Sequence, residues 1–204
     1  MEKFELVSFE PIFETRKTII YQHPLHIKKI IKIAKNFEPD YAWIKKFRLS
    51  RQRFGKMKDY ALHYEAYIAA LSQTDCLPNF LPKYYGFTDT DVGIGCVVEK
   101  ICDLNGQIAP TFKQVCCSNV DLNRLLMLVD ELFFALDKHS VFVGDMHTEN
   151  VVVSGDMERL VVIDGLGEAN LLKTKTYISS IRRRAMTKRH ENFRYEIFKA
   201  MQYR

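Results

Sequence analysis

Three polar side chains in one stretch of the sequence have types and a spacing that can do chemistry together. Within residues 141–166, Asp145 and Asn150 stand five positions apart, and Asp164 follows a second apolar run. Carboxylate and carboxamide oxygens are ligands that suit Mg²⁺, and a carboxylate can also take the proton of a hydroxyl group. The spacing predicts a metal site made by Asn150 and Asp164, with Asp145 facing the hydroxyl group that is to be activated.

Two short apolar runs must position these side chains. Residues 151–153 and 160–163 are β-branched or aliphatic and flank a turn at 154–156, which is typical of a β-hairpin. Such a hairpin brings Asn150 and Asp164 to the same end. An Asp and an Asn five residues apart, followed by an apolar run and Asp-Gly, form the set of groups that phosphoryl transfer uses in protein-kinase-like enzymes.

The structural alternative assigns each of these residues to a turn. Asp145 and Asn150 would cap loop turns, and Asp164 with Gly165 would form an ordinary turn after a strand. For any one of them alone this is the commoner role. Their joint spacing across a hairpin favours the functional interpretation.

Length and composition bound the kind of protein. A chain of 204 residues is long enough for one large domain or two small lobes, and 47% hydrophobic residues fit an ordered protein. The most apolar stretch, 120–136, is interrupted by charged and polar residues, and the N-terminus has no apolar signal segment. We therefore expect neither a membrane span nor a secretory signal. Five cysteines without C-x-x-C spacing indicate reduced thiols and a cytoplasmic protein.

The net charge of +5 belongs to the end of the chain. Residues 173–204 hold ten Lys and Arg against two Glu, whereas the rest holds twenty basic and twenty-three acidic residues. We expect a basic tail of one or two amphipathic helices. It would pack through its apolar residues first, and would secondarily offer a docking surface for an acidic partner, substrate or anionic lipid.

The first part of the chain predicts strands at 4–9, 18–23 and 30–35. Lys32 lies in the third of them, among isoleucines. It would hold the α- and β-phosphates of a nucleotide, or it would be an edge-strand lysine that points to water.

A helix is predicted over 59–71, and Glu65 in its middle is the natural partner of Lys32. The alternative for Glu65 is a solvent-facing position. The preceding residues, 36–58, interleave bases with aromatics, which suits nucleic-acid stacking and equally suits a surface segment with a solvated face. Nucleic-acid binding is the weakest of the functions considered.

Two antiparallel strands are expected to meet at 90–93. The connector that follows, 99–103, would bind an adenine base through backbone groups, with Glu99 and Ile101 as the cofactor-binding positions. Residues 119–140 carry apolar side chains at helical spacing and predict a buried helix.

Further motifs extend the pattern over most of the chain. They are Tyr21-Gln22-His23-Pro24, Ile31-Lys32-Ile33, a block from Leu81 to Gly106, and Asp164-Gly165-Leu166-Gly167-Glu168. On these motifs, from about residue 11 to residue 172, the chain resembles the PhoP regulatory network protein YrbL family, a small bacterial protein-kinase-like group.

The resemblance implies an α+β, protein-kinase-like two-lobed fold, with a small antiparallel β lobe that carries one helix and a truncated helical lobe. The expected segments are 1–103 for the first lobe and connector, 104–172 for the second lobe with the catalytic loop, and 173–204 for the basic tail. It also implies ATP and Mg²⁺ as cofactors, and a regulatory place in an envelope or magnesium-stress network. The implied catalytic set is Asp145, Lys32, Asn150 and Asp164.

Four departures from the usual kinase pattern stand out. The place of the glycine-rich phosphate loop holds Phe13-Glu14-Thr15, so Arg16 or Lys17 would take over its role. Val143-Gly144 replaces the usual His-Arg, and Gly165 replaces the usual phenylalanine. Because about forty residues follow Asp164 in this sequence, we expect no peptide-binding platform.

Two functions follow from these observations. The first is an ATP/Mg²⁺-dependent phosphotransferase acting on a hydroxyl of a small molecule, sugar or lipid headgroup. The second is a pseudokinase-like regulatory or adaptor protein that acts through its basic tail without catalysis. The retained Asp145 favours the first, and the missing glycine-rich loop favours the second.

Overall fold

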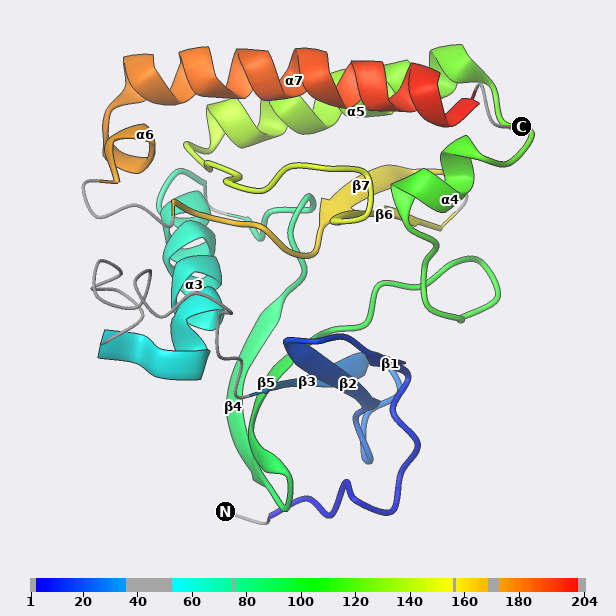
Figure 1. Ribbon diagram of the computed structural model, residues 1–204, viewed down its shortest axis with the longest axis vertical. Coiled ribbons are helices and arrows are strands. Elements are labelled where there is room, and N and C mark those ends of the chain that lie inside the picture. The colour runs from blue at the N-terminus through cyan, green and yellow to red at the C-terminus, as the bar shows by residue number, and fades with distance from the viewer. Residues whose placement is uncertain (1–2, 36–52, 75, 156, 169–172, 202–204) are drawn as a thin grey trace. The chain divides into compact units, whose positions relative to one another are not determined.

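The computed structural model describes residues 3–35, 53–74, 76–155, 157–168 and 173–201. They form a mixed α and β fold with antiparallel sheets (Figure 1). The chain divides into two compact units, one of Met1–Ala61 and Pro82–Lys100 and the other of Leu62–Leu81 and Ile101–Arg204. The predicted basic-aromatic segment, 36–58, lies largely outside the described residues.

The first unit is built on a five-stranded antiparallel sheet in the order β1-β2-β3-β5-β4. Its strands are β1 (Phe13–Glu14), β2 (Thr18–Gln22), β3 (Lys29–Ala34), β4 (Tyr84–Thr90) and β5 (Gly93–Glu99). The predicted strands at 18–23 and 30–35 and the pair that meets at 90–93 are thus confirmed. A short 3-10 helix, η1 (Gly55–Met57), also belongs to this unit.

The strand predicted at 4–9 is wrong. Phe4 makes only an isolated bridge to Thr90, and the chain then turns because the Asp91 carboxylate accepts hydrogen bonds from the backbone N–H groups of Leu6 and Val7, at 2.7 and 3.0 Å. Those two N–H groups are therefore not available for hydrogen bonds to a neighbouring strand. Leu6 instead lies in a buried cluster with Tyr21, Ile31, Ile33 and Val97, and Phe4 packs against this cluster.

The polar residues of the Tyr-x-His-Pro motif close the loop between β2 and β3. The Gln22 side-chain amide donates to three backbone carbonyls within residues 26–29, at 2.9 to 3.1 Å. The Nδ1 atom of His23 accepts a hydrogen bond from the Leu25 N–H at 3.1 Å. His23 is therefore a structural acceptor and must be neutral at Nδ1.

We predict that acid destabilises the first unit through His23. Burial is the main cause that lowers the pKa of His23, and His26 and Lys29 add to it. The folded state thus excludes a proton that the unfolded state binds below pH about 6.5, so the free energy of unfolding falls as pH drops below that value. One proton changes this free energy by at most about 1.4 kcal/mol per pH unit.

Urea unfolding at pH 7.5 and at pH 5.5 tests this prediction. His23→Asn keeps a short acceptor but does not titrate, so the variant should lose less stability between the two pH values than the wild type. An equal loss in both proteins would refute the role of His23.

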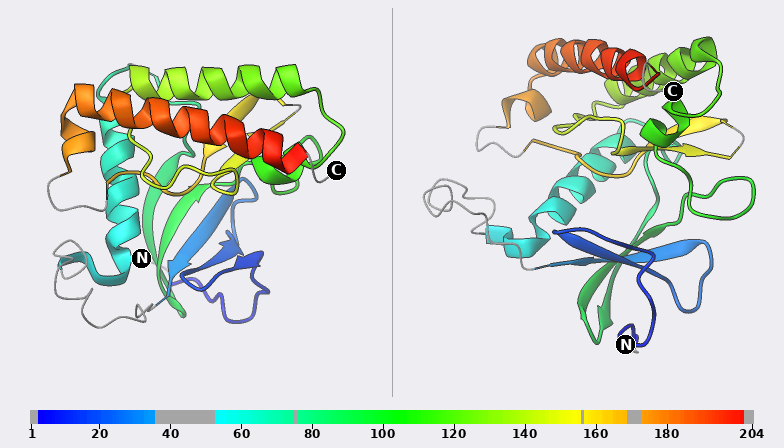
Figure 2. Two further views of the ribbon diagram at one scale, coloured as in Figure 1. Left: turned by 45° about the horizontal axis from the view of Figure 1, so that its top comes forward. Right: turned by 45° about the vertical axis from the view of Figure 1, so that its right-hand side comes forward.

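The second unit combines helices with a two-stranded hairpin (Figures 1 and 2). It holds most of α3 (Lys58–Leu71), together with α4 (Phe112–Cys116), α5 (Leu122–Lys138), β6 (Val151–Ser154), β7 (Arg159–Val162), α6 (Thr174–Tyr177) and α7 (Ser179–Met201). α5 and α7 run side by side. The predicted helices at 59–71 and within 119–140 are confirmed as α3 and α5. No helix among the described residues is long and apolar enough to cross a membrane.

Aromatic packing fixes α7 to the rest of this unit. Phe193 of α7 is fully buried, and its ring centroid lies 5.4 Å from that of Phe112 in α4 and 6.0 Å from that of Phe133 in α5. The packing role predicted for the tail is therefore confirmed.

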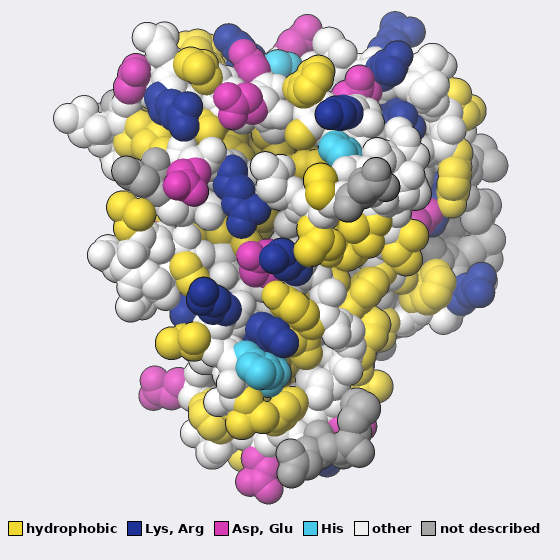
Figure 3. Space-filling model, turned by 180° about the vertical axis from the view of Figure 1, so that it is seen from behind, with side chains coloured by type: hydrophobic (Ala, Val, Ile, Leu, Met, Phe, Trp, Pro, Cys, Tyr) yellow, Lys and Arg dark blue, Asp and Glu magenta, His cyan; other side chains and the backbone are white. Residues whose placement is uncertain are grey.

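Much of the basic character of α7 is also used inside the unit. Four of its arginines bind groups of the same unit: Arg182, Arg183, Arg189 and Arg194. On the face drawn in Figure 3, basic and acidic side chains of the described residues are intermixed, and neither gathers into one large patch.

Candidate functional site

The hairpin of β6 and β7 confirms the predicted placement of Asn150 and Asp164. Val151 pairs with Val162 in the antiparallel register, and the Ile163 N–H donates to the Asn150 carbonyl at 2.9 Å, which extends the pairing by one step. Asn150 and Asp164 therefore lie at the same end of the hairpin.

The Asn150 side chain is tied back to the residue that would act on the acceptor. Its Nδ2 donates to the Asp145 carbonyl at 2.8 Å, and its backbone N–H donates to the His147 carbonyl at 3.0 Å. Because the amide nitrogen is used inside the loop, the amide oxygen is the atom that Asn150 can present to a cation.

The Asp164 carboxylate is oriented from two sides. Its Oδ1 accepts the Gly165 N–H at 2.7 Å and lies 3.2 Å from Nε2 of His63 in α3. The His63 side chain is 6% exposed and that of Asp164 is 62% exposed. A buried imidazole thus holds a carboxylate that is open to a ligand.

Glycines bring the two loops into backbone contact. The Gly165 carbonyl accepts hydrogen bonds from the N–H groups of Gly144 and Asp145, at 2.8 and 3.1 Å. Gly165 has φ +79°, and a Cβ there would lie 2.4 Å from the Asp145 carbonyl oxygen; a Cβ on Gly144 would lie 2.4 Å from the Gly167 carbonyl oxygen. Gly144 and Gly165 are two of the departures from the usual kinase pattern, and this close approach is their physical reason.

Asp145 itself is open to solvent. Its side chain is 77% exposed, and its Oδ2 lies 3.6 Å from Nε2 of His147. A carboxylate so placed is accessible to a hydroxyl group and can accept its proton.

Glu65 binds the C-terminal part of the same unit. Its carboxylate forms an ion pair with Lys173 and accepts a hydrogen bond from the Tyr177 hydroxyl at 2.8 Å. This hydrogen bond raises the pKa of Tyr177. The pairing of Glu65 with Lys32 would join the two units and stays a prediction.

Lys32 lies in the middle of β3, opposite Ile20 of β2 and Cys96 of β5, and is half-buried. It is a central-strand lysine, because β3 is paired on both sides. The edge-strand alternative is therefore wrong, while its role toward a nucleotide stays a prediction.

The connector residues use part of their hydrogen-bonding capacity locally. The Glu99 carboxylate accepts the Lys83 N–H at 3.1 Å, and the Ile101 carbonyl accepts the Ala109 N–H at 2.9 Å. Binding of an adenine base at these two residues stays a prediction.

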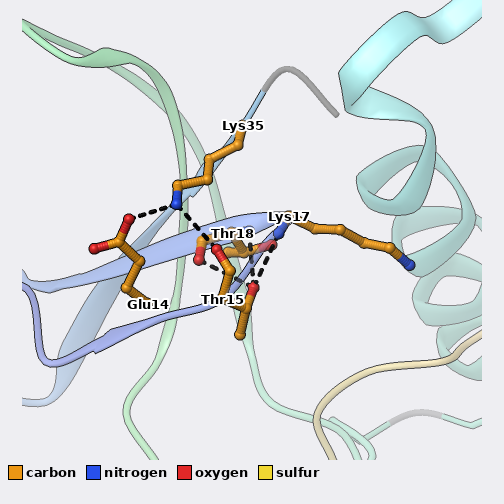
Figure 4. Close-up of polar contacts among 5 residues, drawn as sticks. All are labelled: Glu14, Thr15, Lys17, Thr18 and Lys35. Atoms are coloured by element: carbon orange, nitrogen blue, oxygen red, sulfur yellow. Dashed lines mark hydrogen bonds and ion pairs between the residues drawn. The ribbon is translucent and has the colours of Figure 1, made fainter. Parts of the chain in front are cut away.

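The turn at the position of a glycine-rich loop is closed by its own side chains (Figure 4). The Thr15 hydroxyl accepts hydrogen bonds from the N–H groups of Lys17 and Thr18, at 3.2 and 2.9 Å. Lys35, the residue after β3, holds the turn by donating to the Thr15 carbonyl at 3.0 Å and by forming an ion pair with the Glu14 carboxylate. Two amides that a glycine-rich loop would turn toward phosphate are thus occupied. Phosphate binding by Arg16 or Lys17 at this turn stays a prediction.

The oxygen set suits a hard cation. Asn150 and Asp164 offer an amide and a carboxylate, and no group of three or more His, Cys, Asp and Glu lies together among the residues that the structure describes. Mg²⁺ is usually bound by one or two carboxylates together with phosphate oxygens and water, so a site with two protein ligands fits it.

Three residues of this site were not predicted from the sequence: His63, Arg189 and Glu196. Arg189 donates to the Gly144 carbonyl at 2.7 Å, and Glu196 accepts the Thr148 N–H at 3.1 Å. No local motif marks them, because their partners lie at least 45 positions away in the sequence.

Comparison with known proteins gives the family. The family described as PhoP regulatory network protein YrbL matches residues 5–197. The YrbL proteins of Escherichia coli (strain K12) and Shigella flexneri are each 27% identical over 103 residues. Each alignment covers 48% of this chain and 49% of the relative, so the chain matches about half the length of these curated relatives. Because the family match extends over nearly all of the sequence, the chain belongs to the PhoP regulatory network protein YrbL family.

Proposed function

We propose that this protein is a kinase-like phosphotransferase that uses ATP and Mg²⁺ and acts on a hydroxyl of a small molecule, sugar or lipid headgroup. The observation that carries the proposal is the Asn150 side chain. Its amide nitrogen is bound to the Asp145 carbonyl, so its oxygen is left to a cation beside the hairpin end that also bears Asp164. A turn-closing role for Asn150 would not account for the exposed Asp164 carboxylate at the same end of the hairpin.

The proposed reaction assigns one task to each side chain. Asp145 orients the acceptor hydroxyl and takes its proton, while the new O–P bond forms and the bond from the γ-phosphorus to ADP breaks. Asn150 and Asp164 would hold Mg²⁺, which when bound offsets the negative charge of the phosphates. Lys32 would bind the α- and β-phosphates, and Glu99 and Ile101 would meet the adenine.

The fold class supports the same proposal. A kinase-like first lobe requires an antiparallel sheet with a lysine in a central strand, and the first unit has such a sheet with Lys32 in β3. The name of the family suggests that the reaction serves the PhoP regulatory network, and we propose a role in envelope or magnesium stress.

A second function is favoured by the closed turn at Thr15. Because the hydroxyl of Thr15 occupies the amides of Lys17 and Thr18, a pseudokinase-like regulatory or adaptor protein is the alternative. Its acidic partner would bind α7 through basic residues exposed on that helix, namely Arg184, Lys188 and Lys199.

Replacing Asp145 separates the two functions. Asp145→Asn removes the proton acceptor but keeps the backbone carbonyl that binds Asn150, so we expect kcat to fall by about 10²- to 10⁴-fold with nucleotide binding retained. ADP release is measured with Mg²⁺-ATP and a panel of sugars, small alcohols and lipid headgroups. Glu149→Gln is the matched control, because Glu149 is an exposed residue of the same loop whose partner is Lys113.

Mg²⁺-dependent turnover that is lost in Asp145→Asn and kept in Glu149→Gln would exclude the pseudokinase function. Turnover that persists in Asp145→Asn, or a wild-type protein that releases no ADP with any acceptor class, would contradict the proposed reaction.

A further inference from the structure

Three polar side chains on one face of α7 bind three evenly spaced residues of the segment that leads through the catalytic loop. Arg182, Arg189 and Glu196 are seven residues apart, which is two helical turns or about 10 Å each. Their partners are the Ser140 hydroxyl at 3.0 Å, the Gly144 carbonyl at 2.7 Å and the Thr148 N–H at 3.1 Å, each four residues after the last.

The first of the two loop contacts lies directly beside Asp145. The guanidinium of Arg189 donates to the carbonyl of Gly144, the residue before Asp145, and its Cζ lies 4.7 Å from the centre of the Phe142 ring. Phe142 is buried, so its ring is a fixed surface against which the guanidinium of Arg189 packs. Where the usual kinase pattern has an arginine, this chain has Gly144, and a guanidinium reaches the same backbone from α7.

The second contact lies at the other end of the loop, two residues before Asn150. The Thr148 N–H is bound by Glu196, and the Thr148 carbonyl accepts the Lys113 N–H at 3.1 Å. Thr148 is 6% exposed, so neither of its backbone groups could turn to water without opening the loop.

The helix that carries both contacts is itself anchored. Phe193 lies between Arg189 and Glu196 in the sequence and is fully buried, as is Ile197. The positions of the two polar side chains are therefore fixed by the apolar core of the unit rather than by the loop that they bind.

We propose that α7 positions the catalytic loop, and that Arg189 and Glu196 are the positioning residues. They bind the loop at Gly144 and Thr148, on either side of Asp145, and so hold the distance from Asp145 to Asn150. This inference rests on the proposed function for its effect on turnover. It also gives the basic tail a role within this chain, because residues on its inward face hold the loop that carries Asp145.

The test compares contact residues of α7 with exposed neighbours on the same helix. The contact variants are Arg189→Met and Glu196→Met, with Arg189→Lys as the conservative replacement that keeps a donor. The matched controls are Asn192→Ala and Glu191→Met, whose side chains are exposed. Three quantities are measured on the full chain: kcat and KM for Mg²⁺-ATP, the unfolding midpoint, and amide hydrogen exchange across residues 144–150 without nucleotide.

We expect kcat to fall by about 10- to 100-fold in the contact variants, because a displacement of about 1 Å at a reacting group can cost 10²-fold in rate. KM for Mg²⁺-ATP should change by less than about twofold, Arg189→Lys should recover part of kcat, and the controls should match the wild type. Amide exchange in 144–150 should rise about tenfold or more in Arg189→Met and Glu196→Met alone.

Two results would overturn the inference. One is unchanged exchange in 144–150 in the contact variants. The other is a fall in kcat that follows only the loss of folded protein, with no recovery in Arg189→Lys. If the wild type has no turnover, the proposed function fails, whereas the exchange measurement still decides whether α7 holds the loop.

Discussion

Asp164→Asn should reduce Mg²⁺-dependent phosphoryl transfer by about 10³-fold, the scale on which loss of one charge-stabilising group acts. Asp164 is the only carboxylate of the proposed metal pair, because its partner is the amide of Asn150. Asp164→Asn removes the negative charge of this pair and replaces one of the two side-chain oxygens of residue 164 with an NH₂ group. The fold should persist, because an Asn oxygen can still accept hydrogen bonds from the Gly165 N–H and from Nε2 of His63.

Turnover and unfolding are measured together for this variant. Asp137→Asn is the matched control, since Asp137 lies on α5 and pairs only at the surface with Arg183. The control should keep both turnover and its unfolding midpoint. An Asp164→Asn protein with a wild-type rate would show that Asp164 holds no metal in the reaction, and a variant that is unfolded would assign Asp164 a structural role instead.

Gly165→Ala should be the most destabilising of the glycine substitutions near the site. A side chain at φ +79° costs about 1–2 kcal/mol in itself, and the new Cβ would lie 2.4 Å from the Asp145 carbonyl oxygen and 3.1 Å from Nδ2 of Asn150. Because the obstacle is backbone, it cannot be relieved by a rotamer change. We expect a loss of about 3 kcal/mol or more in the free energy of unfolding, together with loss of turnover.

Gly106→Ala is the control that separates the cost of a positive φ from the cost of the steric overlap at Gly165. Gly106 has φ +75°, and a Cβ there meets nothing within 4 Å. This control should lose only about 1–2 kcal/mol and should keep its activity. At about 2–4 °C per kcal/mol for a chain of this size, thermal unfolding resolves the two variants. Equal midpoints for Gly165→Ala and Gly106→Ala would contradict the close contact between the two loops.

The sequence was most informative where a pattern is local. The β6–β7 hairpin and α5 could be predicted because apolar periodicity reports which face of each element is buried. The same signal misled at residues 4–9, since it does not say whether the backbone pairs with a strand. There the donors of Leu6 and Val7 are taken by Asp91, 85 and 84 positions away.

The candidate site was predictable in part for the same reason. Asp145, Asn150 and Asp164 lie within twenty residues, and one hairpin brings two of them together. His63, Arg189 and Glu196 reach the site from α3 and α7, and no spacing in the sequence relates them to it. Gly144 and Gly165 were noticed as departures from a pattern, but only the approach of their backbones explains them.

Thermal unfolding with and without ATP and Mg²⁺ tests most directly whether this chain has a metal–nucleotide site. A ligand that binds the native state raises the unfolding midpoint by mass action, so even a weak site should respond at millimolar Mg²⁺-ATP. We predict a rise in the wild type that requires Mg²⁺ and is lost in Asp164→Asn. No rise in the wild type, or the same rise in Asp164→Asn, would contradict it.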